Sequence, residues 1–234
     1  AQLEQEANAA LAFAVSKLDE DKTKQALVLG ADADATDADH HTVLSLAASS
    51  GNCGVVRELV NSGANVENLS GNGETPMTSA AKTGQAQVIM LLVEAGADPD
   101  KSDANGTSPL HCAVAAGMED AVDTLLGEAV GANVHLSDVS GKTPLMAAAA
   151  AGRVKLIESL IKHYGADVNA KGGHDETPLS KAAAAGENMA IDTLLKYGAE
   201  IASLNTDGET ALMSAAKHGH TTVIPQLIKA GSDL

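Results

Sequence analysis

Large aromatic side chains are almost absent from this sequence. Its 234 residues include one Phe, two Tyr and no Trp, although 44% of the residues are hydrophobic. Alanine supplies much of that hydrophobic fraction, and small side chains let neighbouring backbones pack closely. We therefore expect thin layers of helices. Because tight protein interfaces favour Trp, Tyr and Arg, a binding partner is expected to supply the large anchoring side chains.

Basic clusters, cysteine frameworks and long apolar runs are also missing. The formal net charge is −16 and no basic tract offsets it, which argues against nucleic acid and anionic membranes as partners. Cys53 and Cys112 lie far apart and offer neither a disulfide framework nor a metal-ligand spacing. No stretch approaches the roughly 18 apolar residues of a membrane span, and the polar start AQLEQEANAA is unlike a secretory signal. These features predict an intracellular protein, cytoplasmic or nuclear.

What the sequence does contain is a repeat. The string GKTPL at residues 141–145 recurs as GETPM (73–77), GTSPL (106–110), ETPL (176–179) and GETAL (208–212), with HTVL (41–44) as a weaker relative. The Thr or Ser of these strings stands at positions 42, 75, 108, 143, 177 and 210, which are 33 to 35 residues apart. Two glycine series, beginning at Gly30 and Gly51, keep the same step. Three series in phase predict a repeat architecture.

Each unit predicts two short helices. Thr is a good helix N-cap, Pro suits the first helical turn, and the glycine after the Ala-Ala pair suits a left-handed C-cap. A second helix follows, with apolar residues three and four positions apart, such as Val88, Leu91 and Leu92. A polar segment then leads to the next unit. One such pair cannot bury its apolar face, whereas stacked neighbours can.

This pattern closely resembles the ankyrin repeat family over essentially the whole chain. The resemblance implies an all-α solenoid of stacked helix-turn-helix units, forming a single domain over residues 1–234. The histidine that usually follows TPL in this family is present only as His111, where the other units carry Ser45, Thr78, Met146, Ser180 and Met213. We place the seven repeats near residues 3–37, 38–70, 71–103, 104–138, 139–172, 173–205 and 206–234.

Three units depart from the common pattern. The first lacks the TPL start and has Lys22 and Thr23 where other units are apolar, so we expect it to cap the N-terminal end. The units that contain Gly131 and Gly165 are two residues and one residue longer, and the extra residues should lie near the end of the second helix. The last unit stops at GSDL without a polar cap, as expected of a fragment of a longer protein.

Four features suggest chemistry, but each has a structural interpretation that we favour. The Gly-Lys-Thr at 141–143 lacks the glycine that a phosphate-binding loop needs at the position of Leu136. The acidic run DADATDAD, residues 32–39, lacks the Gly and Glu of a calcium loop, although a weak cation site stays open as an alternative. No histidine pair has a helical metal-binding spacing, and Cys112 is expected to be a small packed residue. We therefore expect no catalytic residues, no metal and no cofactor.

The resemblance also implies a binding scaffold whose hairpin tips and first helices form a concave groove for a partner protein. The positions of this sequence that match the variable positions of the groove follow. They are Asp39, His41, Ser49, Ser50, Asn72, Glu74, Lys82, Thr83, Asn105, Thr107, Ala115, Ala116, Ser140, Lys142, Ala150, Ala151, His174, Glu176, Asp207, Glu209, Lys217 and His218.

Two features of this set have two interpretations each. The Ala-Ala pairs of units four to six, at 115–116, 150–151 and 184–185, would form a shallow groove for a bulky side chain or a helix, or are simply good helix formers. The acidic tips Asp39, Glu74, Glu176 and Asp207 would attract a basic segment, or form a solvated, aggregation-resistant surface.

The sequence thus predicts a non-catalytic, monomeric protein–protein interaction module whose partner segment is basic or extended. A targeting domain of a larger enzyme is one alternative, and a structural or self-associating spacer is another.

Overall fold

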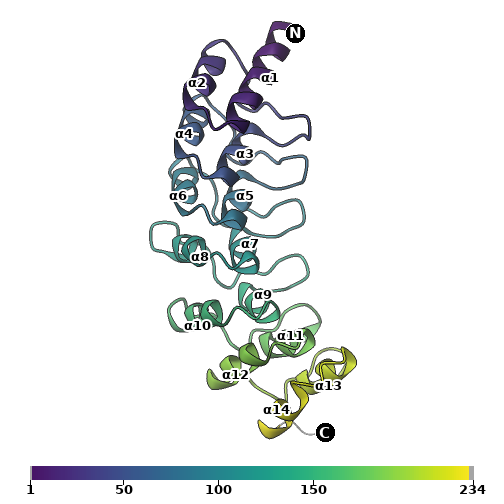
Figure 1. Cartoon of the computed structure of the whole chain (residues 1–234). Helices are drawn as coiled ribbons and strands as arrows, with labels where there is room; N and C mark the ends of the chain where they lie inside the picture. Colours follow the sequence, from purple (N-terminus) through teal and green to yellow (C-terminus); the bar gives the residue numbers. More distant parts are fainter. Residues whose placement is uncertain (1, 232–234) are drawn as a thin grey trace. The chain divides into compact units, whose positions relative to one another are not determined.

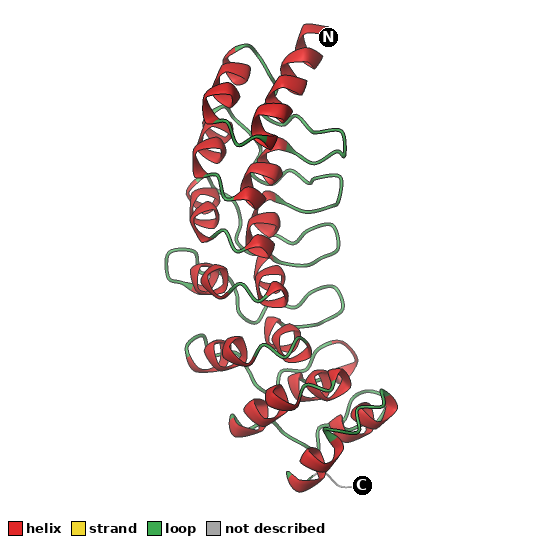
Figure 2. Cartoon of the chain, in the orientation of Figure 1, coloured by secondary structure: helices red, strands yellow, loops and turns green. Residues whose placement is uncertain are grey.

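The computed structural model describes residues 2–231, and within them the chain is helical with no strand (Figures 1 and 2). One isolated β-bridge joins Thr36 and Thr42. None of the described helices has the length and apolar character needed to cross a bilayer. The last three residues of the seventh predicted unit lie outside the described residues. The helices are α1 (Gln2–Ser16), α2 (Glu20–Val28), α3 (Val43–Ser50), α4 (Cys53–Asn61), α5 (Pro76–Thr83), α6 (Ala86–Glu94), α7 (Pro109–Ala116), α8 (Glu119–Leu126), α9 (Pro144–Ala150), α10 (Val154–Lys162), the 3₁₀ turn η1 (Gly173–Asp175), α11 (Pro178–Ala185), α12 (Asn188–Lys196), α13 (Ala211–Lys217) and α14 (Ile224–Lys229).

The described helices pair in succession, and their contacts divide the chain into two compact units, residues 1–132 and 133–234. In the first unit, the helices α1, α3, α5 and α7 pack in succession in one layer, and we call them the inner helices. The helices α2, α4, α6 and α8 form a second layer, and we call them the outer helices (Figure 1). In the second unit, α9, α11 and α13 form the equivalent inner layer, and α10 packs on α12. The predicted fold class, stacked helix-turn-helix units, is confirmed. The single-domain boundary stays a prediction.

The inner helices begin where the sequence predicts. In each of α3, α5, α7, α9, α11 and α13, the Thr or Ser at the N-cap accepts a hydrogen bond from the backbone N–H three residues later. In four of them the left-handed C-cap is glycine, for example Gly84 with a φ of 80°. Two helices, α9 and α13, end two residues before the glycine, with Ala151 and His218 as their C-caps. The repeated Thr and Gly therefore set the helix boundaries.

The buried side chains are small or aliphatic. Alanines of the inner helices, such as Ala47 and Ala80, are fully buried, and so are Leu59 and Leu92 of the outer layer. Thr23, a polar residue of the first unit, is also fully buried, and its hydroxyl donates to the Asp19 carbonyl at 2.8 Å. The extra residues of the fourth repeat form a turn at 127–130, directly after α8, as predicted.

Candidate binding face

The predicted site residues fall into three groups on the hairpins and inner helices, and all of them are at least partly exposed. The residues at the hairpin tips are exposed: Asp39, Asn72, Asn105, Ser140, His174 and Asp207. The residues just before the N-caps are half-buried: His41, Glu74, Thr107, Lys142, Glu176 and Glu209. The remainder lie at or just beyond the ends of the inner helices: Ser49, Ser50, Lys82, Thr83, Ala115, Ala116, Ala150, Ala151, Lys217 and His218.

A polar side chain five positions before the N-cap holds four of the hairpin tips. The Asp37 Oδ1 atom accepts hydrogen bonds from the backbone N–H groups of Asp39 (2.9 Å) and His41 (2.8 Å). Asp103, Asp138 and Asn205 accept the same pair of bonds in their own hairpins. Because one side-chain oxygen fixes two backbone amides, the tip is held in one conformation. Sequence reasoning missed this role, although an Asp or Asn in phase with the repeat was a signal for it.

Backbone hydrogen bonds also join neighbouring hairpin tips inside each unit. They run from Gly71 N to His40 O (2.7 Å), from Ala104 N to Gly73 O (2.8 Å) and from Thr206 N to His174 O (2.9 Å). These bonds satisfy backbone groups that would otherwise need water. The side chains at the tips therefore project from a backbone that is fixed both within a repeat and between repeats.

Acidic residues next to the N-caps are paired with lysines of the same repeat. The Glu74 carboxylate accepts from Lys82 Nζ at 2.6 Å and from Ser79 Oγ at 2.9 Å. Desolvation acts to raise the pKa of Glu74, but these bonds outweigh it and hold the pKa below its ordinary value. Glu74 is therefore ionised and its charge is largely balanced by Lys82.

Two such pairs also occur in residues 133–234. Glu176 pairs with Lys181, and Glu209 pairs with Lys217 at 2.8 Å. Of the four acidic residues predicted to form a negative rim, Glu74 and Glu176 thus have lysine partners, whereas no ion pair of the described residues includes Asp39 or Asp207. The negative charge of the tips is more local than the sequence alone indicated.

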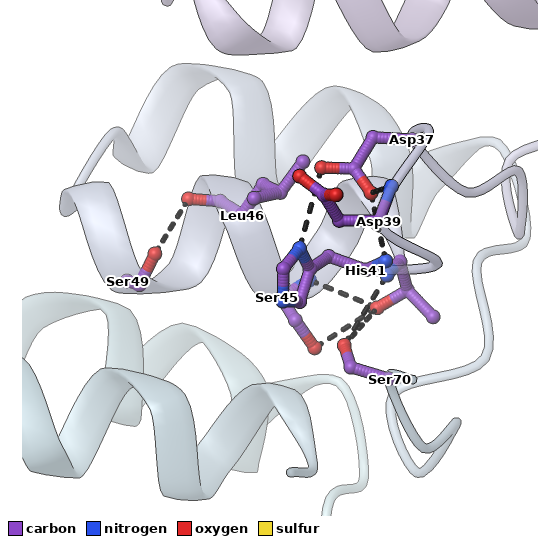
Figure 3. A network of polar contacts seen from close by, with 8 residues as sticks. Asp37, Asp39, His41, Ser45, Leu46, Ser49 and Ser70 are labelled. Carbon is purple, nitrogen blue, oxygen red and sulfur yellow. Dashed lines mark hydrogen bonds and ion pairs between the residues drawn. The ribbon is translucent and has the colours of Figure 1, made fainter. Parts of the chain in front are cut away.

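Asp37, Asp39 and His41 gather at the first hairpin (Figure 3). Their potential ligand atoms lie within 4.8 Å of one another, and they form the one group of this kind in residues 2–231. Asp37 already accepts two backbone N–H groups, and its Oδ2 lies 3.3 Å from the Nδ1 atom of His41. Because Asn205 performs the same backbone role in a later hairpin, turn formation accounts for the position of the Asp37 side chain without an ion.

The residues that resemble parts of catalytic or phosphate-binding motifs have structural roles. The hydroxyl of Thr143, in the Gly-Lys-Thr string, accepts from Met146 N at 3.3 Å as a helix cap. His111 is buried, with its Nδ1 atom 2.8 Å from Ser108 Oγ. Desolvation, with Asp103 and Glu74 nearby, raises the pKa of the half-buried Cys112 thiol to about 12. At neutral pH this thiol is protonated and is a poor nucleophile.

Phe13 is a further exposed residue on an inner helix, and sequence reasoning missed it. It lies on α1, and 59% of its surface is exposed. Position 13 is 33 residues before Leu46, which is half-buried on α3 in the next repeat. The repeat spacing could have revealed this equivalence. The first repeat lacks the Thr or Ser N-cap string that sets the register of the other repeats, so the equivalence is less evident there.

The charge is unequally divided between the two units. Residues 1–132 contain 20 acidic and 6 basic residues, a net charge of −14, whereas residues 133–234 contain 11 and 9, a net charge of −2. The field that a charged partner experiences near the first unit is therefore strongly negative.

Comparison with known proteins agrees with this architecture. A family model described as ankyrin repeats (3 copies) matches residues 11–103, 90–172 and 170–234. The crystal structure of the human ASB11 ankyrin repeat domain is similar, with a TM-score of 0.83 and 27% sequence identity over 97% of this chain and 99% of that chain. A search of curated proteins found no match.

Proposed function

This chain belongs to the ankyrin-repeat family, and we propose that it binds a basic segment of a partner protein on the face formed by its hairpin tips and inner helices. Ankyrin repeats are generally protein–protein interaction modules, and the family is typically non-catalytic. The fold alone names no partner, so the proposal rests on the side chains of this face.

The geometry of the face supports binding of another polypeptide. Its tips are fixed by side-chain and backbone hydrogen bonds, so little ordering of the protein is needed when a partner binds. At the end of α7, in residues 1–132, the side chains are small, because Ala115 and Ala116 occupy it. Large side chains of a partner can therefore lie close to the helix backbone there.

The charge of the first unit is the observation that carries the choice of a basic segment. Its net charge of −14 favours approach of Lys- and Arg-rich sequences and disfavours acidic ones. The same charge disfavours association between copies of this chain, so a self-associating spacer is not the function that we propose.

Selection of peptides on the full chain tests the proposal. Random peptides displayed on phage would be selected on the immobilised protein, and the enriched peptides would be synthesised and titrated. We expect them to be rich in Lys and Arg and to bind several-fold more weakly when NaCl rises from about 50 mM to about 500 mM.

A variant that blocks the face identifies where the peptides bind. Ala115→Arg adds bulk and positive charge at an exposed position of α7, and we expect it to abolish binding. Met189→Ala, which truncates an exposed apolar residue of α12, is the control. If no peptide is enriched, or if Ala115→Arg binds as tightly as the unmodified chain, the proposed function is wrong.

A further inference from the structure

A groove of about 530 Å³ lies beside α1 at the first hairpin. One wall is α1, through Ala9, Ala12 and Phe13, and the other is the hairpin, through Asp37 and Ala38. Its apolar lining consists of three alanines and the chain's single phenylalanine, and its polar lining includes Gln5, Asn8, Ser16 and Thr36. Its shape and lining provide space for one large side chain from outside.

The long first helix creates this groove. Helix α1 has 15 residues, whereas the inner helices that follow it have seven or eight. Asn8 ties the helix to the chain after α2, because its side-chain oxygen accepts from Asp32 N–H at 2.8 Å. The groove thus has a fixed wall on each side, with Asp37 held by the backbone of its own turn.

The charges at the groove have a defined order. Lys17 Nζ lies 5.6 Å from the centre of the Phe13 ring, so the Phe13 side already carries a cation. The hairpin side carries Asp37 and Asp39, whose carboxylate oxygens lie within 4.8 Å of each other (Figure 3). A second cation is repelled near Lys17 and attracted near the two aspartates.

We propose that this groove is the subsite that fixes the register of the partner segment, and that it takes a large apolar side chain against Phe13 with a Lys or Arg of the same segment at Asp37 and Asp39. The inference rests on the proposed function and gives it a location and a sequence preference. Binding hot spots are typically aromatic and Arg side chains that fill well-packed, desolvated pockets.

Two equivalent hairpins of the chain provide a test variant of this subsite and its matched control. Asp37→Asn removes the charge but keeps the turn, because Asn205 accepts the same two backbone bonds in another repeat. Asp103→Asn makes the matched change two repeats away. Phe13→Ala truncates a mostly exposed side chain on a helix, so the fold is retained.

The peptides selected on the full chain are titrated against these variants. We expect the enriched sequences to carry a large apolar residue within a few positions of Lys or Arg. Phe13→Ala should weaken binding by about tenfold or more, and Asp37→Asn several-fold, whereas Asp103→Asn should bind within twofold of the unmodified chain.

Three outcomes separate the subsite from the proposed function. If Ala115→Arg blocks binding while Phe13→Ala and Asp37→Asn do not weaken it, the subsite is wrong and the binding face stands. If Asp103→Asn weakens binding as much as Asp37→Asn, charge acts without a local subsite, which also overturns the inference. If no basic peptide binds at all, both proposals fail.

Discussion

At the scale of the residue, a glycine at a hairpin tip shows how backbone conformation and packing act together. Gly73 has a φ of 81°, and a Cβ atom placed on it would lie 2.7 Å from the Cβ atom of Ala104 in the next hairpin. We predict that Gly73→Ala lowers the free energy of unfolding by about 1–3 kcal/mol, measured by urea denaturation. Gly63→Ala is the control, because Gly63 has a φ of 90° with no atom near its added methyl group. Equal losses for the two variants would show that contact between the hairpins contributes nothing.

The thiol of Cys112 offers a pH-dependent test at the same scale. Desolvation raises its pKa to about 12 from an ordinary value of 9.0, so at neutral pH its thiolate fraction is about a thousandfold smaller than that of an ordinary thiol. In a Cys53→Ser background, its alkylation by iodoacetamide should be slow at neutral pH and still accelerate above pH 10. The urea-unfolded protein serves as the reference. A rate that levels off near pH 9 in the folded protein would contradict the burial of this group.

Residues with one evident local role could be predicted from the sequence, whereas residues that depend on their neighbours could not. The N-cap Thr75 and the C-cap Gly84 can each be predicted from the residues at one end of the helix, and the structure confirms both. The pairing of Glu74 with Lys82 spans eight residues and joins a hairpin to the end of a helix, so it required coordinates. The groove at Phe13 depends on the unusual length of α1, which no repeat string indicates.

At the scale of the element, each inner helix begins with a cap whose completeness differs between repeats. In α5 the Thr75 hydroxyl accepts from Thr78 N at 3.1 Å, and the Thr78 hydroxyl accepts from Thr75 N at 2.8 Å. In α9 the residue equivalent to Thr78 is Met146, whose side chain cannot return such a bond. The first type is a capping box, which satisfies two backbone donors at once.

We predict that Thr75→Val and Thr78→Val each lower the free energy of unfolding by roughly 0.5–2 kcal/mol, because each removes a hydroxyl while nearly conserving volume. The double variant should lose less than the sum, since the two hydroxyls serve each other. Urea denaturation of the four proteins in this cycle measures the coupling. Strict additivity would show that the two hydroxyls act independently.

At the scale of the whole molecule, family and fold class were predictable because the repeated strings recur in phase along the chain. The charge division was also present in the sequence, but it has meaning only once the two units are known. The paired lysines of the face could not be predicted, and they leave Asp39 and Asp207 as the tip carboxylates without an ion pair among the described residues. We therefore expect the first unit to dominate attraction of a basic partner.

The most direct test of the binding face is a map of where a selected basic peptide changes the backbone amide signals. Two-dimensional ¹H–¹⁵N NMR spectra of the deuterated full chain would be recorded during titration with the peptide. We predict that the largest shifts fall on the hairpin tips and on α1, α3, α5 and α7, beginning at the Phe13 groove. Shifts confined to the outer helices α2, α4, α6 and α8 would contradict the account.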